Sequence, residues 1–488
     1  MALGWWWRVI RTGGCEEVRT EGCDVNISIY DCVSPLDFRY YGQDRELLEQ
    51  LGPYVSERGR LRAELQVEVA LVRVLARRGL CTPQAAEEIA AAAQQVTPEE
   101  VAAEEERIQH NTRAMVNCLR ARVSETARPF VHMTLTSFDV VDTARAWLFR
   151  EATRNVILPE LLKLEKVLID LALREKETLQ IGRTHGQHAV PITFGFAIAQ
   201  YVNRLGDRIE ALRGAAEALP GKISGAVGAY NATSLFFDDP AAFEAEVLAE
   251  LGMKPALAST QIAPPEPMAD FVHALLTTMG VFANLADDMR HLQRTEIAEV
   301  GERFEAQQVG SSTMPHKRNP WNFENIKSMW KAFAPRVLTQ YMDQISEHQR
   351  DLSNSASGRF LPEIIVAVVS TARRLRRVMG KLVTDPERMR ANLEMTKGLI
   401  AAEPAYILLA ALGHPDAHER LRTLTLEAQA TGRPLGELLF SAEDLKPYLS
   451  RLTEQQREVL LRPEKYTGRA AQRTEAVCAY WAERLGLS

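Results

Sequence analysis

The feature of this 488-residue sequence that most restricts its fold is a long helical repeat of apolar side chains between residues 272 and 292. A second repeat covers residues 156–173. Apolar residues that return every three or four positions mark one face of an α-helix, whereas alternating strand patterns and hairpin dipeptides are nearly absent. Because a helix gains about 1.5 Å per residue, such lengths favour a bundle whose helices extend past a single globular radius. We therefore predict an all-α fold, in which the longest repeat consists of Val272, Leu275, Met279, Phe282, Leu285, Met289 and Leu292.

The chain is too long for a single core, because one domain usually holds roughly 100–200 residues. We expect an N-terminal helical domain at 28–130, a central long-helix bundle domain at 131–370 and a C-terminal helical domain at 371–488. Residues 1–27 lack both the apolar run and the small-residue cleavage site of an export signal. We expect them to form a flexible extension with little bearing on function.

Composition and charge exclude several classes of protein. The 58 basic and 64 acidic residues leave a net charge of −6, which does not suggest a nucleic acid or a membrane as partner. No charge-free apolar run reaches the roughly 18–20 residues of a membrane span. The six cysteines show neither metal-finger nor CxxC spacing, so we expect reduced thiols in a cytoplasmic protein. A local basic pocket for an anionic substrate is compatible with this balance.

Five short polar segments interrupt the helical repeats. Each is rich in Gly, Ser, Thr, His, Asn or Pro, and loops of this kind on a rigid helical scaffold are where sites are usually built. They are VHMTLTSFD at 131–139, GRTHGQHAVP at 182–191, GAVGAYNATS at 225–234, VGSSTMPHKRNP at 309–320 and HQRDLSNSASGR at 348–359.

The segment at 309–320 carries the most specific pattern. Gly310 provides a hinge, Ser311 and Ser312 provide hydroxyls, and Lys317 provides a cation on the same loop. A hydroxyl becomes a useful base only where positive charge lies near and its proton has an acceptor, so this combination points to catalysis. A hinged loop could also close over a substrate and exclude water. A Ser/Gly linker is the alternative interpretation of the segment taken alone.

GSSTMPHKRNP in this segment resembles the GSSxMPxKxNP signature of the fumarase/aspartase superfamily, whose members cleave or form a bond beside a carboxylate and mostly release fumarate. The resemblance implies a three-domain fold with a long central helical bundle. It implies that Ser312 removes a proton from the carbon beside the carboxylate, with Ser311 among the substrate contacts. Lys317 and Asn319 would hold that carboxylate, because fixed cations and amides aimed at growing charge stabilise the transition state more than the ground state.

TSFDVVDTA resembles a second block of the superfamily. Thr136 and Ser137 precede a helix that Asp139 is expected to open, and the free N–H groups of a helix start can bind a carboxylate. A plain N-cap role explains Ser137 almost as well.

RTHGQHAVPITFG resembles a third block. In this block His185 is the expected general acid, because imidazole titrates near neutrality and the departing nitrogen must be protonated. Thr184 beside it is an expected substrate contact. The resemblance also implies that Glu324 pairs with His185 and tunes its proton affinity. A structural histidine and a solvated helix face are the alternatives for these two residues.

Within the superfamily, three features are similar to the adenylosuccinate lyase family. SPLDFRYYG resembles its opening segment, which would place Arg39 and Tyr40 against a nucleotide. EEERIQHNTRAMVNCL resembles a segment that would make His110 a second active-site histidine. Asn111 stands where the family has Asp, so the contribution of that carboxylate is open.

The third feature is HQRDLSNSASGR, which is similar to the family's H-x-RD-(I/L)-S-x-S-x-x-x-R run. Arg350, Ser355 and Arg359 would handle the nucleotide, the last two at its phosphate, because a guanidinium matches phosphate with a bidentate fork. A salt-bridged surface turn is the alternative.

One further loop matches the family only in part. Gln261 in STQIAPPEP resembles the glutamine of a family loop that reaches the substrate carboxylate. Pro265 and Glu266 stand where Arg and Asp are usual, which leaves the contacts of this loop open.

The resemblance implies an enzyme that cleaves adenylosuccinate to AMP and fumarate, and the related succinyl-aminoimidazole-carboxamide ribotide of purine biosynthesis to its carboxamide product and fumarate. No metal or organic cofactor is expected. A homotetramer is implied, with each site assembled from three chains. The preference between the two substrates stays open.

Three other functions are compatible with parts of this sequence. A 3-carboxy-cis,cis-muconate cycloisomerase can share the signature, but its substrate has no phosphate for the arginines. Argininosuccinate lyase usually has Gln and Lys where this chain has His316 and Arg318. An inactive structural scaffold, like the lens crystallins derived from this superfamily, would be expected to lose the polar segments that this chain retains.

Overall fold

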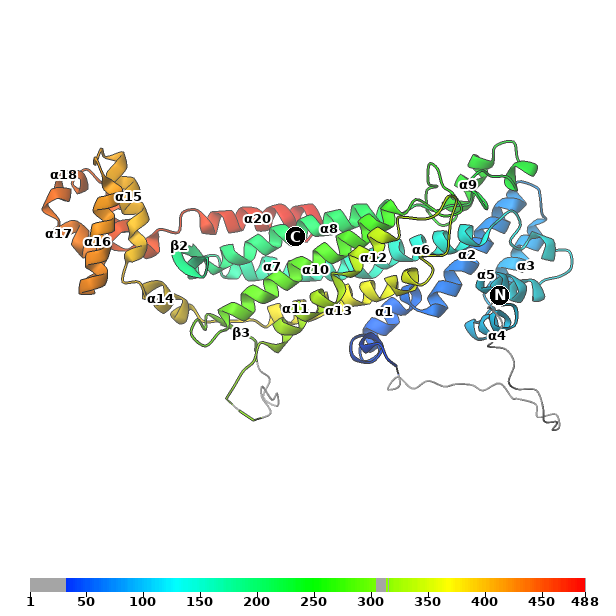
Figure 1. Ribbon diagram of the computed structural model, residues 1–488, viewed down its shortest axis with the longest axis horizontal. Helices are drawn as coiled ribbons and strands as arrows, with labels where there is room; N and C mark the ends of the chain where they lie inside the picture. Colours follow the sequence, from blue (N-terminus) through cyan, green and yellow to red (C-terminus); the bar gives the residue numbers. More distant parts are fainter. Residues whose placement is uncertain (1–31, 304–312, 315, 488) are drawn as a thin grey trace, which may run out of the picture.

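The computed structural model describes residues 32–303, 313–314 and 316–487, and this part of the chain is mainly helical, as predicted (Figure 1). Its N-terminal helices are α1 (Arg45–Val55), α2 (Glu57–Arg77), α3 (Pro83–Ala93), α4 (Pro98–Ile108) and α5 (Asn111–Ala121). The middle contains α6 (Ser137–Ala152), α7 (Leu158–Arg174), α8 (Phe194–Glu217), α9 (Pro240–Ala249), α10 (Glu266–Leu292), α11 (Trp321–Phe333), α12 (Arg336–Met342) and α13 (Leu361–Gly380). The C-terminal helices are α14 (Pro386–Glu394), α15 (Ala402–Ala411), α16 (Ala417–Thr431), α17 (Leu435–Ser441), α18 (Lys446–Leu449), α19 (Glu454–Leu461) and α20 (Ala470–Leu485).

The long apolar repeat at 272–292 lies in α10, the central helix of an elongated bundle. Helices α8, α11 and α13 pack against α10, in which Phe271, Met279 and Phe282 are buried. By length and mean hydropathy, 1.3, this helix could cross a membrane, which the sequence interpretation did not identify. However, 67% of that stretch is buried inside the protein. Such burial is typical of a core helix in a helical bundle.

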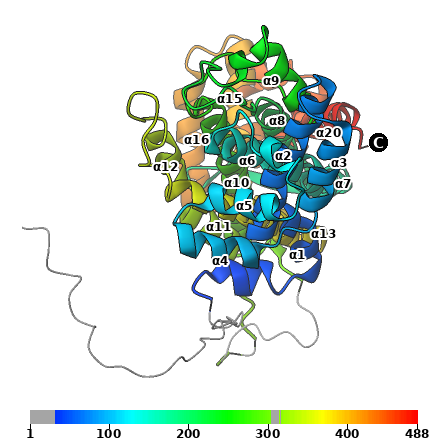
Figure 2. The same ribbon diagram turned by 90° about the vertical axis from the view of Figure 1, so that its right-hand side faces the viewer.

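The N-terminal helices cover one end of the bundle (Figures 1 and 2). Helix α2 packs along α6, and α1 packs on α13. The boundary predicted at residue 130 lies between α5 and α6. The apolar core is nevertheless continuous across it, from Leu36 in the N-terminal part to the central helices.

The C-terminal helices divide into two groups. Side chains from Ala401 to Leu460 form an apolar core of their own at the other end of the molecule. Helix α20 instead returns to the bundle and packs on α7 and α8. Trp481 of α20 lies so close over Gly206 that a Cβ at this glycine would come within 2.3 Å of the indole ring. The predicted boundary at residue 371 falls inside α13, which also belongs to the bundle.

The segment GRTHGQHAVP forms a β-hairpin, a feature that the sequence interpretation missed. Strands β1 (Leu179–Thr184) and β2 (Gln187–Thr193) are antiparallel, and Thr184 pairs with Gln187. The two residues between them, His185 and Gly186, both have positive φ angles, 54° and 75°. Such two-residue turns match the twist of the strands. A second short pair joins β3 (Val300–Gly301) to β4 (Val383–Thr384).

Glu165 on α7 makes the stability of this bundle depend on pH. Both of its carboxylate oxygens are buried without a hydrogen-bond partner in the described part of the chain. Burial raises the pKa of this carboxyl from 4.5 to about 9. Between about pH 4.5 and pH 9, the folded protein therefore keeps a proton on Glu165 that the unfolded chain releases. The folded state consequently loses stability as the pH rises through this range.

We expect Glu165→Gln, which imitates the protonated carboxyl, to raise the unfolding temperature at pH 8 and to change it little at pH 4.5. Thermal unfolding of both proteins across this range measures the difference. The exposed Glu177→Gln variant is the control for a general effect of removing one negative charge. An equal gain at both pH values would contradict the assignment of Glu165.

Candidate active site

The start of α6 presents N–H groups and a hydroxyl at the end of the bundle nearest the N-terminal helices. Thr136 is the N-cap residue, and its N–H donates to Oδ2 of Asp139 over 2.8 Å. Ser137 is the first helical residue and Asp139 the third, which corrects the expectation that Ser137 is the cap and Asp139 opens the helix. The N–H groups of a first helical turn lack intrahelical acceptors, so this end suits an anion.

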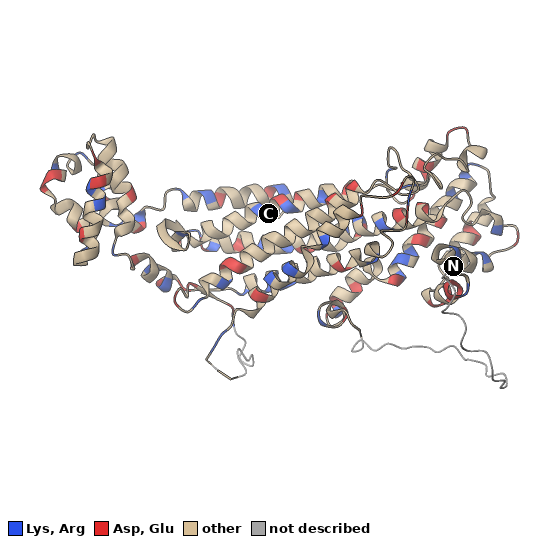
Figure 3. Ribbon diagram, viewed as in Figure 1, with Lys and Arg blue, Asp and Glu red and all other residues tan. Residues whose placement is uncertain are grey.

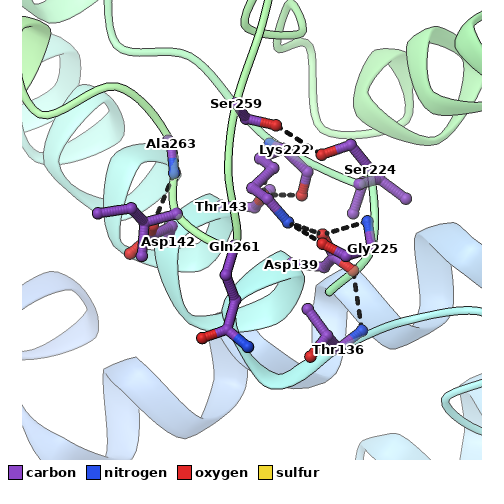
Figure 4. A network of polar contacts seen from close by, with 12 residues as sticks. Thr136, Asp139, Asp142, Thr143, Lys222, Ser224, Gly225, Ser259, Gln261 and Ala263 are labelled. Atoms are coloured by element: carbon purple, nitrogen blue, oxygen red, sulfur yellow. Dashed lines mark hydrogen bonds and ion pairs between the residues drawn. The ribbon is translucent and has the colours of Figure 1, made fainter. Parts of the chain in front are cut away.

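A buried ion pair lies directly beneath this helix start. The carboxylate of Asp139 contacts Nζ of Lys222, and neither side chain is exposed to solvent. Lys222 also donates to the carbonyl of Gly225 over 2.8 Å, and the N–H of Gly225 donates to Asp139 over 3.1 Å (Figure 4). Burial raises the pKa of Asp139 above its usual value, although Lys222 and the two backbone N–H groups lower it in part. The three donors that surround Asp139 are the environment of a carboxylate ion.

One helical turn further, Asp142 fixes the loop that carries Gln261. Oδ2 of Asp142 accepts the N–H of Ala263 over 3.0 Å, and Oδ1 accepts from Arg145 over 2.7 Å. In Figure 4 the side chains of Gln261 and Thr136 both lie below the contact between Asp139 and Lys222. The departure from the family pattern at residues 265–266 lies at the start of α10, where Pro265 is the N-cap and Glu266 the first helical residue.

Arg350 joins this group and has unused hydrogen-bonding capacity. One terminal nitrogen of its guanidinium donates to Oε1 of Gln261 over 3.3 Å, and the group stacks on the Phe138 ring. Its Nε and Nη2 are buried and have no partner in the described part of the chain. Burial also lowers the pKa of this guanidinium. Because buried donors are normally satisfied, the two open nitrogens indicate a place for an anionic or hydrogen-bond-accepting ligand.

Ser355 and Arg359 lie on the adjacent loop and are exposed. Asp343 fixes this loop by accepting hydrogen bonds from Oγ of Ser357 at 2.9 and 2.8 Å. The loop also touches α6, because a Cβ at Gly358 would come within 2.9 Å of the Arg145 guanidinium. The structure therefore brings the segment 348–359 to the start of α6, as a shared site requires.

A second group of predicted residues gathers at the start of α11. The hydroxyl of Tyr40 accepts a hydrogen bond from the Asn325 amide over 3.0 Å, which places the segment of Arg39 and Tyr40 beside Glu324. Arg39 and Glu324 are exposed. Just before α11, Lys317 is exposed and Asn319 is half-buried. Ser311 and Ser312, which the sequence predicts on the same loop, lie outside the described residues.

His185 and Thr184 form a third group at the opposite end of the bundle (Figure 1). They are exposed at the tip of the hairpin that leads into α8, whereas Lys222 and Gly225 follow the end of α8. The 24 residues of α8 span about 36 Å, so one chain cannot bring His185 to the start of α6. His185 also makes no hydrogen bond or ion pair with Glu324 within the described residues of one chain.

Two further histidines precede the start of α6 in the sequence. His110 is exposed and caps α5 by accepting the N–H of Arg113 on Nδ1 over 3.2 Å. His132, four residues before Thr136, was missed by the sequence interpretation although it lies in a segment that was singled out. Its Nδ1 is 2.6 Å from Glu68; burial lowers the pKa of His132, but the Glu68 carboxylate raises it and dominates. The signal was Glu68, which together with Glu64 is one of two carboxylates among the buried, mainly apolar residues of α2.

The chain matches a lyase family model over residues 39–332 and an adenylosuccinate lyase C-terminal model over residues 346–467. It is 36% identical to the adenylosuccinate lyase of Pyrococcus abyssi, over 92% of this chain and 98% of that one. The adenylosuccinate lyase of Archaeoglobus fulgidus is 34% identical, over 93% of this chain and 99% of its own length. This chain belongs to the adenylosuccinate lyase family.

The fold agrees with this family, and proteins outside the family have it too. The structure of 3-carboxy-cis,cis-muconate lactonizing enzyme from Pseudomonas putida superimposes with a TM-score of 0.77, covers 89% of this chain and 97% of its own, and is 27% identical. The architecture is therefore shared with enzymes that act on other substrates. Among members of this superfamily, the adenylosuccinate lyases match this sequence closely over nearly its whole length.

Proposed function

We propose that this protein cleaves adenylosuccinate to AMP and fumarate, and succinyl-aminoimidazole-carboxamide ribotide to its carboxamide product and fumarate. The observation that carries the proposal is the Arg350 guanidinium next to Gln261 and the start of α6, since two of its buried nitrogens have no partner among the residues that the structure describes. A substrate with both a phosphate and two carboxylates suits such a set of donors.

The proposed reaction divides the work among these groups. The first turn of α6 at Thr136 and Ser137, together with Gln261, binds the succinyl arm. Ser312 removes the carbon-bound proton, and Lys317 with Asn319 stabilises the charge that this step places on the neighbouring carboxylate. His185 is the general acid that protonates the departing nitrogen. The proposed site also includes His110, Glu324, Thr184 and Ser311. The nucleotide is contacted by Arg39, Tyr40, Arg350, Ser355 and Arg359.

A homotetramer with shared sites is part of this proposal. The distance along α8 separates His185 from Gln261 within one chain, so a complete site needs more than one copy. Exposed apolar side chains also mark α12 and the turn that follows it, where a second copy could cover them: Leu338, Tyr341, Met342 and Ile345.

We also propose a cytoplasmic location and no nucleic-acid or membrane partner. Cys81, Cys118 and Cys478 form no disulfide within the described part of the chain. Reduced thiols are typical of that compartment. Acidic and basic side chains are interspersed along the helices (Figure 3).

Arg350→Met is expected to raise KM for adenylosuccinate by about 10- to 100-fold, since a hydrogen bond to a charged group contributes roughly 1.5–3 kcal/mol. Steady-state kinetics measures the change. Arg457→Met is a matched control, because Arg457 also stacks on a phenylalanine ring but lies among the C-terminal helices. An unchanged KM in the Arg350 variant would remove this residue from substrate binding.

The proposed activity is tested by offering adenylosuccinate, argininosuccinate and 3-carboxy-cis,cis-muconate separately to the purified protein. Ultraviolet absorbance follows product formation in each case. We expect turnover of adenylosuccinate alone. Turnover of either competitor in its place would reassign the enzyme within the superfamily, and no change with any of the three would overturn the proposal.

A further inference from the structure

The ion pair between Asp139 and Lys222 is unusual because both charged side chains are fully buried. The two residues are 83 positions apart in the sequence. Removing two charges from water is costly, and a buried ion pair often stabilises a protein no more than apolar residues of the same volume. Its presence at the start of α6 therefore calls for an explanation other than stability.

The position of Asp139 creates an electrostatic conflict with the proposed function. A carboxylate in the first turn of a helix caps its N–H groups, and here it accepts the N–H of Thr136. The same turn is where the proposed function places a substrate carboxylate. An uncompensated negative charge at Asp139 would repel that group across a medium of low dielectric constant.

Lys222 removes this conflict because its ammonium group is held rigidly against Asp139. The hydroxyl of Thr143, one turn after Asp139 on α6, donates to the carbonyl of Lys222 and accepts its N–H, both over 2.9 Å. Nζ of Lys222 also donates a hydrogen bond to the carbonyl of Gly225. The loop that follows is tied to the Gln261 loop by a hydroxyl contact of 2.6 Å between Ser224 and Ser259 (Figure 4).

We propose that Lys222 is a positioning residue that neutralises Asp139 beneath the start of α6, so that this helix start attracts the succinyl carboxylate of the substrate. The inference rests on the proposed function and deepens it. Lys222 does not touch the substrate; it acts through Asp139 and through the loop at Gly225. Lys222 contributes by cancelling the negative charge of Asp139. A merely structural role would not require a positive charge at this position.

A series of charge variants tests the proposal: Lys222→Met, Asp139→Asn and the double variant, with fumarate as competitive inhibitor. Lys222→Met leaves a buried negative charge, and we expect it to weaken fumarate binding by about 10- to 100-fold, the effect of one charge at about twice contact distance and an effective dielectric constant of ~20. The double variant should recover most of this loss. Asp139→Asn should bind fumarate at least as tightly as the wild type.

Two controls separate a local charge effect from misfolding. AMP carries no succinyl arm, so its inhibition constant should be unchanged in every folded variant. Lys166→Met breaks an exposed ion pair with Asp170 on α7 and should leave fumarate binding unchanged. If Lys222→Met does not fold, the double variant and Asp139→Asn still decide the question.

The possible outcomes distinguish this inference from the proposed function. Fumarate binding in Lys222→Met equal to the wild type, a double variant as weak as Lys222→Met, or weakened binding in Asp139→Asn would each overturn the role of Lys222. Failure of the wild-type protein to bind fumarate or to cleave adenylosuccinate would overturn the proposed function instead.

Discussion

Replacing Ser312 by alanine is expected to lower the turnover of adenylosuccinate by at least roughly 10²- to 10⁴-fold, the usual effect of removing a positioned acid or base. The hydroxyl is the proposed acceptor of the carbon-bound proton, and alanine offers no group that can replace it. Turnover of the purified variant, measured beside its circular dichroism and unfolding temperature, tests this expectation.

The fold should survive this substitution, since the side chain loses only one oxygen atom. Ser450→Ala, at an exposed serine of the C-terminal helices, is the control and should keep full activity. Turnover close to that of the wild type in Ser312→Ala would remove this serine from the mechanism.

Mixing two inactive variants should restore activity if each site is built from several chains. His185→Ala and Gln261→Ala each damage a different end of the bundle and should each be nearly inactive. When their subunits are dissociated together and reassembled, some sites receive an intact His185 from one chain and an intact Gln261 from another. Activity well above the sum of the separate variants is therefore expected.

A chain that carries both substitutions provides the control for this experiment. Mixed with His185→Ala, it leaves no intact His185 in any site, so no activity should return. Mixtures of His185→Ala and Gln261→Ala that stay inactive, although the mixed oligomers form, would show that one chain supplies both residues.

The features that sequence predicts well are local ones. The repeat from Val272 to Leu292 lies in α10, because a helical face is set by residues three and four positions apart. The polar segments at 182–191, 225–234 and 348–359 lie between helices, since costly polar residues stand out between apolar repeats. The sequence interpretation did not identify His132 because its partner, Glu68, is 64 positions away in the sequence.

Contacts between distant parts of the chain could not be predicted from spacing. Nothing near residue 222 shows that its lysine is buried against Asp139, and nothing near residue 481 shows that its indole lies on Gly206. The hairpin at 179–193 was missed because its turn is His-Gly rather than a familiar hairpin dipeptide. Each of these features depends on tertiary packing that brings separate helices together.

The distribution of the site over the bundle follows from helix length. The hairpin with His185 precedes α8 and the loop with Gly225 follows it, so the rise of α8 separates them in any single chain. The motifs predict which residues belong to one site. Only the structure shows that they lie at opposite ends of one chain.

The most direct test of this account is a crystal structure of the assembled protein with AMP and fumarate bound. We predict that one fumarate is surrounded by Ser312, His185 and the α6 start at Thr136, with His185 and Thr136 contributed by different chains, and that Arg350 faces the nucleotide. An assembly in which Ser312 and His185 cannot reach the same fumarate would contradict the account.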